Sequence, residues 1–270
     1  MTQSLPPIRR HFIDGPFGQV HVRTCGDASS KRPLLCLHQS PKSSREFVNI
    51  LPHLAKDRFV VAVDNPGHGE SDVPNAEADA TVPNYAQSAW AAVDALGLPG
   101  KIDILGHHTG AKVATEMAYQ RPDHVGGIVM VSALVLTAEE VAAFKDQFQE
   151  VALDAAGTRF TKMWAASIQH RGPGVSLIDL AASFAENLRA GEAYEWGHKA
   201  AFGYNDYFAD RVASLPHKIT VLNPNDMLYD LTPRVAPLLQ NGRVQDQADW
   251  GFGFMDSDTE NAAHVILEAL

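Results

Sequence analysis

The stretch KIDILGHHTGAKVATEMAYQ, residues 101–120, decides the fold class. Residues 101–105 form a short apolar run that is typical of a buried parallel strand, and residues 111–120 are typical of a helix. Gly106 and Gly110 bracket the junction and predict a tight turn from strand to helix, because residues without Cβ let backbone segments approach closely. Such a turn presents its central residue, His108, above the edge of the sheet.

Strand and helix patterns alternate along most of the chain. Further strands are predicted over residues 19–25, 33–37, 59–63, 127–131 and 218–222. Further helices are predicted over residues 43–55, 84–96 and 258–270. This alternation indicates an α/β fold in which helices flank a mostly parallel, twisted sheet.

The alternation stops after residue 131, and the chain then has helical patterns without a convincing strand until residue 218. We therefore predict an α/β core in two parts, residues 1–133 and 215–270, with a helical cap insertion at 134–214. A cap of this kind covers the carboxyl ends of the strands, where open parallel sheets bind their ligands.

Composition excludes several classes of protein. The 270 residues include 22 Lys and Arg against 32 Asp and Glu, a net charge of −10, which argues against binding nucleic acid or an anionic membrane. Two cysteines cannot form a disulfide framework, and neither a signal peptide nor a membrane span is evident. We expect a cytoplasmic protein with a small-molecule substrate, and the sequence leaves a homodimer open.

Four short motifs follow predicted strands. They are HQSP at 38–41, DNPGHGES at 64–71, GHHTG at 106–110 and NPND at 223–226. Their order and spacing resemble the α/β-hydrolase superfamily over nearly the whole chain. The second motif is similar to the Asp-x-Pro-Gly-His-Gly-x-Ser loop of that family, and the third has the outline of its nucleophile elbow, Gly-x-Ser-x-Gly.

The chain departs from the family pattern at two catalytic positions. His108 stands where the elbow has its serine, so no acyl-enzyme can form through a hydroxyl there. Phe252 stands where we would expect the catalytic histidine, and the nearest later histidine, His264, lies well inside the last predicted helix, where a structural role is favoured. The resemblance therefore implies an atypical member rather than a standard serine hydrolase.

Other features of a catalytic site are retained. Asp226 occupies the position where many family members carry the triad acid; it either pairs with His108 or is a structural carboxylate. Backbone N–H groups of Gln39 and Thr109 are expected to form an oxyanion hole. His38 fits the first position of a His-Gly pattern whose glycine is replaced by Gln39, and a loop-bracing role is favoured for it.

His108 can act without a triad because imidazole titrates near neutral pH. The amino end of the helix that begins near Gly110 is expected to lower the pKa of His108, and His107 is expected to stay neutral as well. His108 could then act as a general base or add directly to an acyl group.

The predicted cap supplies candidates for substrate binding. Its aromatic and soft residues are Met163, Trp164, Trp196, Phe202, Tyr204, Tyr207 and Phe208. Most are expected to pack against the core, with one or two lining an apolar pocket, and we include Trp164 with His107 and Phe252 among the substrate-binding candidates. Cationic candidates for a substrate carboxylate are Arg159, Arg171 and Lys199, whereas His170 and His198 are predicted to lie at the surface.

No cofactor or metal is predicted. His107 and His108 are adjacent, and neighbouring residues of a regular element point apart, so they are not expected to bind one ion together. The sequence favours an enzyme that acts on an ester, a lactone or a C–C bond beside a carbonyl, with His108 as base or nucleophile. A cofactor-free lyase, isomerase or oxygenase and a non-catalytic ligand-binding pseudo-hydrolase are the alternatives.

Overall fold

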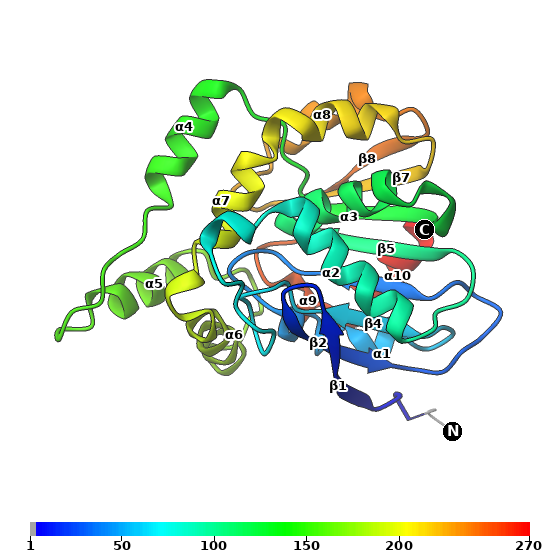
Figure 1. Ribbon diagram of the computed structural model, residues 1–270, viewed down its shortest axis with the longest axis horizontal. Coiled ribbons are helices and arrows are strands. Elements are labelled where there is room, and N and C mark those ends of the chain that lie inside the picture. Colours follow the sequence, from blue (N-terminus) through cyan, green and yellow to red (C-terminus); the bar gives the residue numbers. More distant parts are fainter. Residues whose placement is uncertain (1–3) are drawn as a thin grey trace.

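A computed structural model describes residues 4–270 of the chain. Its centre is one eight-stranded sheet with the order β1-β2-β4-β3-β5-β6-β7-β8 (Figure 1). The strands are β1 Ile8–Gly15, β2 Gly18–Cys25, β3 Leu34–Leu37, β4 Val60–Val63, β5 Ile102–His107, β6 Val125–Val131, β7 Lys218–Pro224 and β8 Gly242–Gln247. β1 pairs with β2, and β2 with β4, in antiparallel fashion, and the six strands β3 to β8 are mutually parallel. The predicted mostly parallel α/β fold is thereby confirmed.

Ten α-helices and five short 3-10 helices surround the sheet within the described residues. The α-helices are α1 Leu51–Leu54, α2 Val82–Ala95, α3 Thr109–Gln120, α4 Ala138–Gln147, α5 Thr158–Gln169, α6 Leu177–Arg189, α7 Trp196–Gly203, α8 Asn205–Ser214, α9 Phe254–Ser257 and α10 Thr259–Ala269. Buried side chains of α2, α3 and α8 form one apolar core, and those of α1, α9 and α10 form the other, so the sheet is covered on both faces. None of the helices in residues 4–270 has the length and apolar character needed to cross a bilayer.

The central strands follow from their composition. β3 and β4 are completely buried because their residues, LLCL and VVAV, have no polar side chain that would require water. The outer strands β1 and β8 were not predicted from the sequence, because their residues are largely polar. Edge strands tolerate such residues because only one side of the strand is paired and much of it meets solvent.

The helix predicted over 43–55 is interrupted. A 3-10 turn at Ser44–Phe47 is followed by the short helix α1, which begins at Leu51 with Pro52 in its first turn. Proline is tolerated in that place because its missing N–H would have no partner there, but in the middle of a long helix it would remove a hydrogen bond.

Helices α4 to α6 project from the carboxyl side of the sheet, whereas α7 and α8 pack beside α3 (Figure 1). The predicted absence of strands between residues 131 and 218 agrees with the assigned elements. The turn between α5 and α6 contains Gly172, whose N–H donates to the carbonyl of Phe252 at 3.0 Å. A Cβ on Gly172 would collide with that same carbonyl oxygen, so glycine is required for this close approach. The exact boundaries of a cap remain a prediction.

Candidate active site

The strand-to-helix turn at His108 has the strained geometry expected of an elbow. β5 ends at His107 and α3 begins at Thr109, with His108 between them at φ 47° and ψ −108°. A residue with a side chain seldom adopts positive φ, and such strain persists only where the surrounding structure enforces it. Gly110 contributes to this enforcement, because a Cβ there would collide with the carbonyl of Leu37 on β3.

His108 and Asp226 form an imidazole–carboxylate pair. Nε2 of His108 lies 2.8 Å from Oδ2 of Asp226. The same Oδ2 accepts a hydrogen bond from the Ser132 hydroxyl at 2.6 Å, and Oδ1 accepts one from the Leu228 N–H at 2.7 Å. Burial would raise the pKa of Asp226, but the charge of His108 and the hydrogen bonds outweigh it and lower the pKa to about 2. The carboxylate is therefore ionised at neutral pH.

This pairing decides which nitrogen of His108 has a free lone pair. An ionised carboxylate only accepts hydrogen bonds, so Nε2 must carry the proton and Nδ1 keeps its lone pair. Burial lowers the pKa of His108 and outweighs the opposing attraction of Asp226. The direction agrees with the prediction, but burial, rather than the helix, is the largest cause.

A second imidazole–carboxylate pair lies beside the first. Nδ1 of His107 is 2.6 Å from Oε1 of Glu46, and Glu46 also accepts from the side chain of Gln39 at 2.5 Å and from its backbone N–H at 3.1 Å. Burial opposes ionisation of Glu46, but the charge and hydrogen bond of His107 prevail and lower its pKa to about 2.

Glu46 changes the predicted oxyanion hole. The N–H of Gln39, expected to face an oxyanion, is already engaged by the Glu46 carboxylate, which the sequence offered no reason to place there. The N–H of Thr109 opens α3, where the first amides have no acceptor within the helix. Of the two expected donors, the Thr109 N–H therefore stays the candidate, because Thr109 lines the cavity.

His38 braces two loops. Its Nδ1 is 2.8 Å from the carbonyl of Gln39, and its Nε2 accepts the N–H of Asn65 at 2.9 Å. Both ring nitrogens are therefore used, and the side chain is fully buried. The geometry agrees with the loop-bracing role favoured from the sequence.

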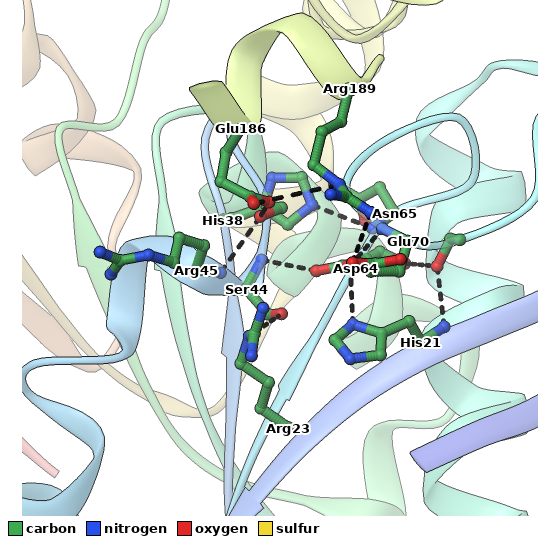
Figure 2. Close-up of polar contacts among 12 residues, drawn as sticks. His21, Arg23, His38, Ser44, Arg45, Asp64, Asn65, Glu70, Glu186 and Arg189 are labelled. Carbon is green, nitrogen blue, oxygen red and sulfur yellow. Dashed lines mark hydrogen bonds and ion pairs between the residues drawn. The ribbon is translucent and has the colours of Figure 1, made fainter. Parts of the chain in front are cut away.

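Asp64 organises the 64–71 loop (Figure 2). Its carboxylate is 2.8 Å from Nδ1 of His21 and accepts the backbone N–H groups of Ser44 at 2.6 Å and Glu70 at 2.9 Å. Glu70 also forms an ion pair with Arg189 of α6, so the loop contacts the helical segment as well. The 64–71 motif thus serves to join loops.

A cavity of about 260 Å³ opens between the strand ends and the helices above them. Of the predicted site residues, it is lined by Gln39, His107, His108, Thr109 and Phe252. Trp164 does not line it: its ring packs against Phe184 of α6 with 5.3 Å between centroids, because the neighbouring position on α5, Met163, is the one that faces the cavity.

The other residues of the helical segment divide between cavity and packing. Phe202 and Arg171 line the cavity, whereas Arg159 pairs with Glu192 and Lys199 with Glu77 and Glu150. His170 is exposed, as predicted, and also contributes to the cavity wall, whereas His198 is half-buried in that wall and pairs with Glu195, so the surface prediction is wrong for His198. Their helices bend over the strand ends, an arrangement that local sequence does not specify.

Phe252 occupies the place beside the elbow where a catalytic histidine was expected. Its ring meets that of His108 nearly perpendicularly, at 85°, with centroids 6.3 Å apart. His264 is exposed on α10 and pairs with Glu268, so it does not replace the missing residue.

Three important residues were missed from the sequence: Glu46, Ser132 and Lys112. Glu46 and Ser132 are the hydrogen-bonding partners described above. Lys112 is buried in the cavity wall, donates to the carbonyl of Ala201 at 2.9 Å, and has its pKa lowered to about 7 by burial. Lys112 falls on the predicted helix over residues 111–120, but no motif in the sequence marked it as facing the cavity.

His107, His108 and Asp226 are also close enough to contact one ion. Each offers a ligand atom, and these atoms all lie within 4.8 Å of one another. The expectation that adjacent histidines point apart is wrong here, because positive φ at His108 interrupts the regular backbone on which it was based.

The chain belongs to the α/β hydrolase fold family, whose model matches residues 32–204. Curated relatives include a serine hydrolase-like protein of Danio rerio, 31% identical over 126 residues, or 47% of this chain and 38% of that protein. A proline iminopeptidase of Lactobacillus delbrueckii subsp. bulgaricus is 30% identical over 129 residues, or 44% of this chain and 42% of that protein. The matches thus span less than half of either relative.

Solved structures match over nearly the whole chain. The esterase EaEST of Exiguobacterium antarcticum has a TM-score of 0.77 at 16% identity, covering 96% of this chain and 98% of that one. The epoxide hydrolase VrEH1 of Vigna radiata has a TM-score of 0.75 at 18% identity, covering 97% of both chains. At these identities the likeness establishes the fold and leaves the reaction to be argued from the site.

Proposed function

We propose that the protein hydrolyses small esters or lactones with His108 as a general base in place of a serine nucleophile. The observation that carries this proposal is the His108–Asp226 pair, which holds the imidazole by Nε2 and leaves the lone pair of Nδ1 available at a cavity. Relatives and structural neighbours described as a peptidase, an esterase and an epoxide hydrolase make hydrolysis the favoured class.

In the proposed reaction, Nδ1 of His108 takes a proton from water as the water oxygen attacks the substrate carbonyl. Asp226 stabilises the imidazolium that forms, and the N–H of Thr109 donates to the developing oxyanion. When the intermediate collapses, the imidazolium returns its proton to the leaving oxygen, which restores neutral His108.

Direct attack by Nδ1 on the carbonyl is an alternative route to the same products. It would form an acyl-imidazole, which water then cleaves. A burst of the first product in rapid mixing would identify this route, whereas a linear time course supports attack by water.

The test is turnover of p-nitrophenyl acetate, p-nitrophenyl butyrate and γ-butyrolactone by EDTA-treated protein. We expect activity that is lost in His108→Gln and retained in His264→Gln, a control at an exposed histidine. A fluorophosphonate that labels catalytic serines should not react with the protein. Equal activity in wild type and His108→Gln, or fluorophosphonate labelling that abolishes turnover, would reject the proposal.

Ligand binding without turnover is the second candidate, and one observation favours it. Glu46 engages the N–H of Gln39, and a negative carboxylate beside the expected oxyanion position opposes development of a second negative charge. Saturable binding of an ester or lactone to wild type, measured by calorimetry with no product after prolonged incubation, would favour this candidate. Turnover of an unsaturated keto acid would instead favour a lyase or isomerase that uses the same base.

A further inference from the structure

We propose that His107, His108 and Asp226 bind a divalent transition-metal ion beside the cavity that the two histidines line. One ligand atom from each residue lies within 4.8 Å of the other two, and all three residues are buried or half-buried. Two imidazoles and one carboxylate on neighbouring loops form a donor set that suits Zn²⁺, Co²⁺ or Fe²⁺. Mg²⁺ and Ca²⁺ are disfavoured because they prefer oxygen ligands.

The elbow turn brings the two imidazoles together. Their ring centroids are 4.5 Å apart and the planes are nearly perpendicular, at 82°. On a regular strand, consecutive side chains would point to opposite faces, but the backbone turns sharply at His108. A chain segment of two residues therefore supplies two ligands to one position.

The partners of His107 match those of a metal-binding histidine. Such residues usually donate one ring N–H to a carboxylate, which fixes the orientation of the ring and leaves the other nitrogen for the metal. Glu46 accepts the Nδ1 proton of His107 at 2.6 Å and is itself held by Gln39. This arrangement leaves the lone pair of Nε2 available.

Asp226 and His108 can bind the ion without rearranging the loops. Their contacting atoms are 2.8 Å apart, and two ligands that lie ~2.1 Å from one tetrahedral ion are ~3.4 Å apart, so a small separation of the two side chains admits the ion. Asp226 is already oriented by Ser132 and Leu228. The metal would replace the proton between the two groups, and that proton would move from Nε2 to Nδ1 of His108.

This inference rests on the same residues as the proposed hydrolysis and has a definite consequence for it. Once Nδ1 carries the proton, His108 has no lone pair with which to act as a base. Bound metal should therefore inhibit the metal-free reaction. The ion would act as a regulator or inhibitor of the proposed activity.

Binding can be measured on full-length protein that carries no polyhistidine tag, by calorimetry with Zn²⁺ and by visible absorption with Co²⁺. We expect one ion per chain and Co²⁺ bands that report nitrogen and oxygen ligands. His107→Gln and Asp226→Asn should abolish the bands. Glu46→Gln should weaken Zn²⁺ binding by about 10- to 100-fold, because it removes the partner of a ligand and leaves the ligand itself.

The matched control is His264→Gln, which removes an exposed histidine that also has a carboxylate neighbour. It should bind Zn²⁺ as wild type does, and circular dichroism should show that every variant folds. Absence of stoichiometric binding to wild type, or equal binding to wild type and a correctly folded His107→Gln variant, would overturn the metal site.

Activity measured in parallel separates this inference from the proposed function. Turnover in EDTA that Zn²⁺ suppresses supports both. Stoichiometric binding without turnover under any condition supports the metal site and rejects the hydrolase. Turnover in EDTA by a protein that binds no Zn²⁺ or Co²⁺ rejects the metal site and leaves the hydrolase in place.

Discussion

Two imidazole–carboxylate pairs with the same spacing lie in different surroundings. His108 and Asp226 are 2.8 Å apart at the cavity, and His21 and Asp64 are 2.8 Å apart beneath the 64–71 loop. The side chain of His108 is 14% exposed, whereas that of His21 is 1% exposed and its second nitrogen is buried without a hydrogen-bond partner. An imidazole–carboxylate pair can therefore act as a general base only where the second ring nitrogen is accessible to a substrate or to water.

The largest effect is expected from His108→Gln. Glutamine can still reach Asp226 but cannot accept a proton at neutral pH, so the rate of ester or lactone hydrolysis should fall by about 10³-fold, within the range for loss of a general base. His21→Gln is the matched change in the His21–Asp64 pair, which we call the sealed pair because both side chains are 1% exposed. The kcat of this variant, measured under conditions in which it is folded, should stay within about threefold of wild type. A comparable loss of kcat in both variants would remove the distinction between the pairs.

The sealed pair should matter more for stability. Asp64→Asn replaces a carboxylate that accepts hydrogen bonds from His21, Ser44 and Glu70, so at least one buried donor loses a good acceptor. We expect a decrease of about 3 kcal/mol in the free energy of unfolding, measured by urea denaturation. A decrease below about 1 kcal/mol would mean that the loop does not depend on this carboxylate.

Asp226→Asn should reduce the reaction rate more than it reduces the stability of the fold. The variant loses the ionised acceptor that orients His108, and we expect kcat to fall by about 10²-fold, with a smaller loss of stability than in Asp64→Asn. The charge of Asp226 raises the pKa of His108, so its removal should also shift the acid limb of the pH–rate profile to lower pH. An unchanged limb would indicate a purely structural carboxylate.

The last prediction concerns the pH dependence of stability at His68 in the 64–71 loop. Burial lowers the pKa of His68 to about 3. Between pH 6.5 and 3, His68 is therefore protonated in the unfolded chain and neutral in the folded chain. His68 should therefore reduce stability as pH falls through this window, by about 1.4 kcal/mol per pH unit, and contribute nothing to the slope above pH 6.5. Thermal melts of wild type and His68→Gln across pH 4–7 check this, since the variant should show the shallower dependence.

The sequence was sufficient for the elements whose causes are local. Buried apolar runs predicted the inner strands, and the glycines around His108 predicted the elbow. The polar outer strands were missed because the alternation that marks an edge is weak there. The break at Pro52 could have been anticipated from its missing N–H.

The partners within the site were harder to foresee because they depend on distant segments. Asp226 was identified as a candidate, but its contact with His108 spans 118 positions of sequence and became visible only in the fold. Glu46 carries no motif, yet it engages both His107 and Gln39. Trp164 was chosen over Met163 although one helical position decides which of them faces the cavity.

Gly172 links the turn between α5 and α6 to the elbow through Phe252. Its backbone is bonded to that of Phe252, whose ring meets His108 edge-on. A methyl group added at residue 172 would collide with the carbonyl oxygen of Phe252. The resulting displacement of Phe252 would change the contact between its ring and the imidazole of His108. Reactivity at the elbow could thus be tuned from a turn between two helices, without altering any residue that meets the substrate.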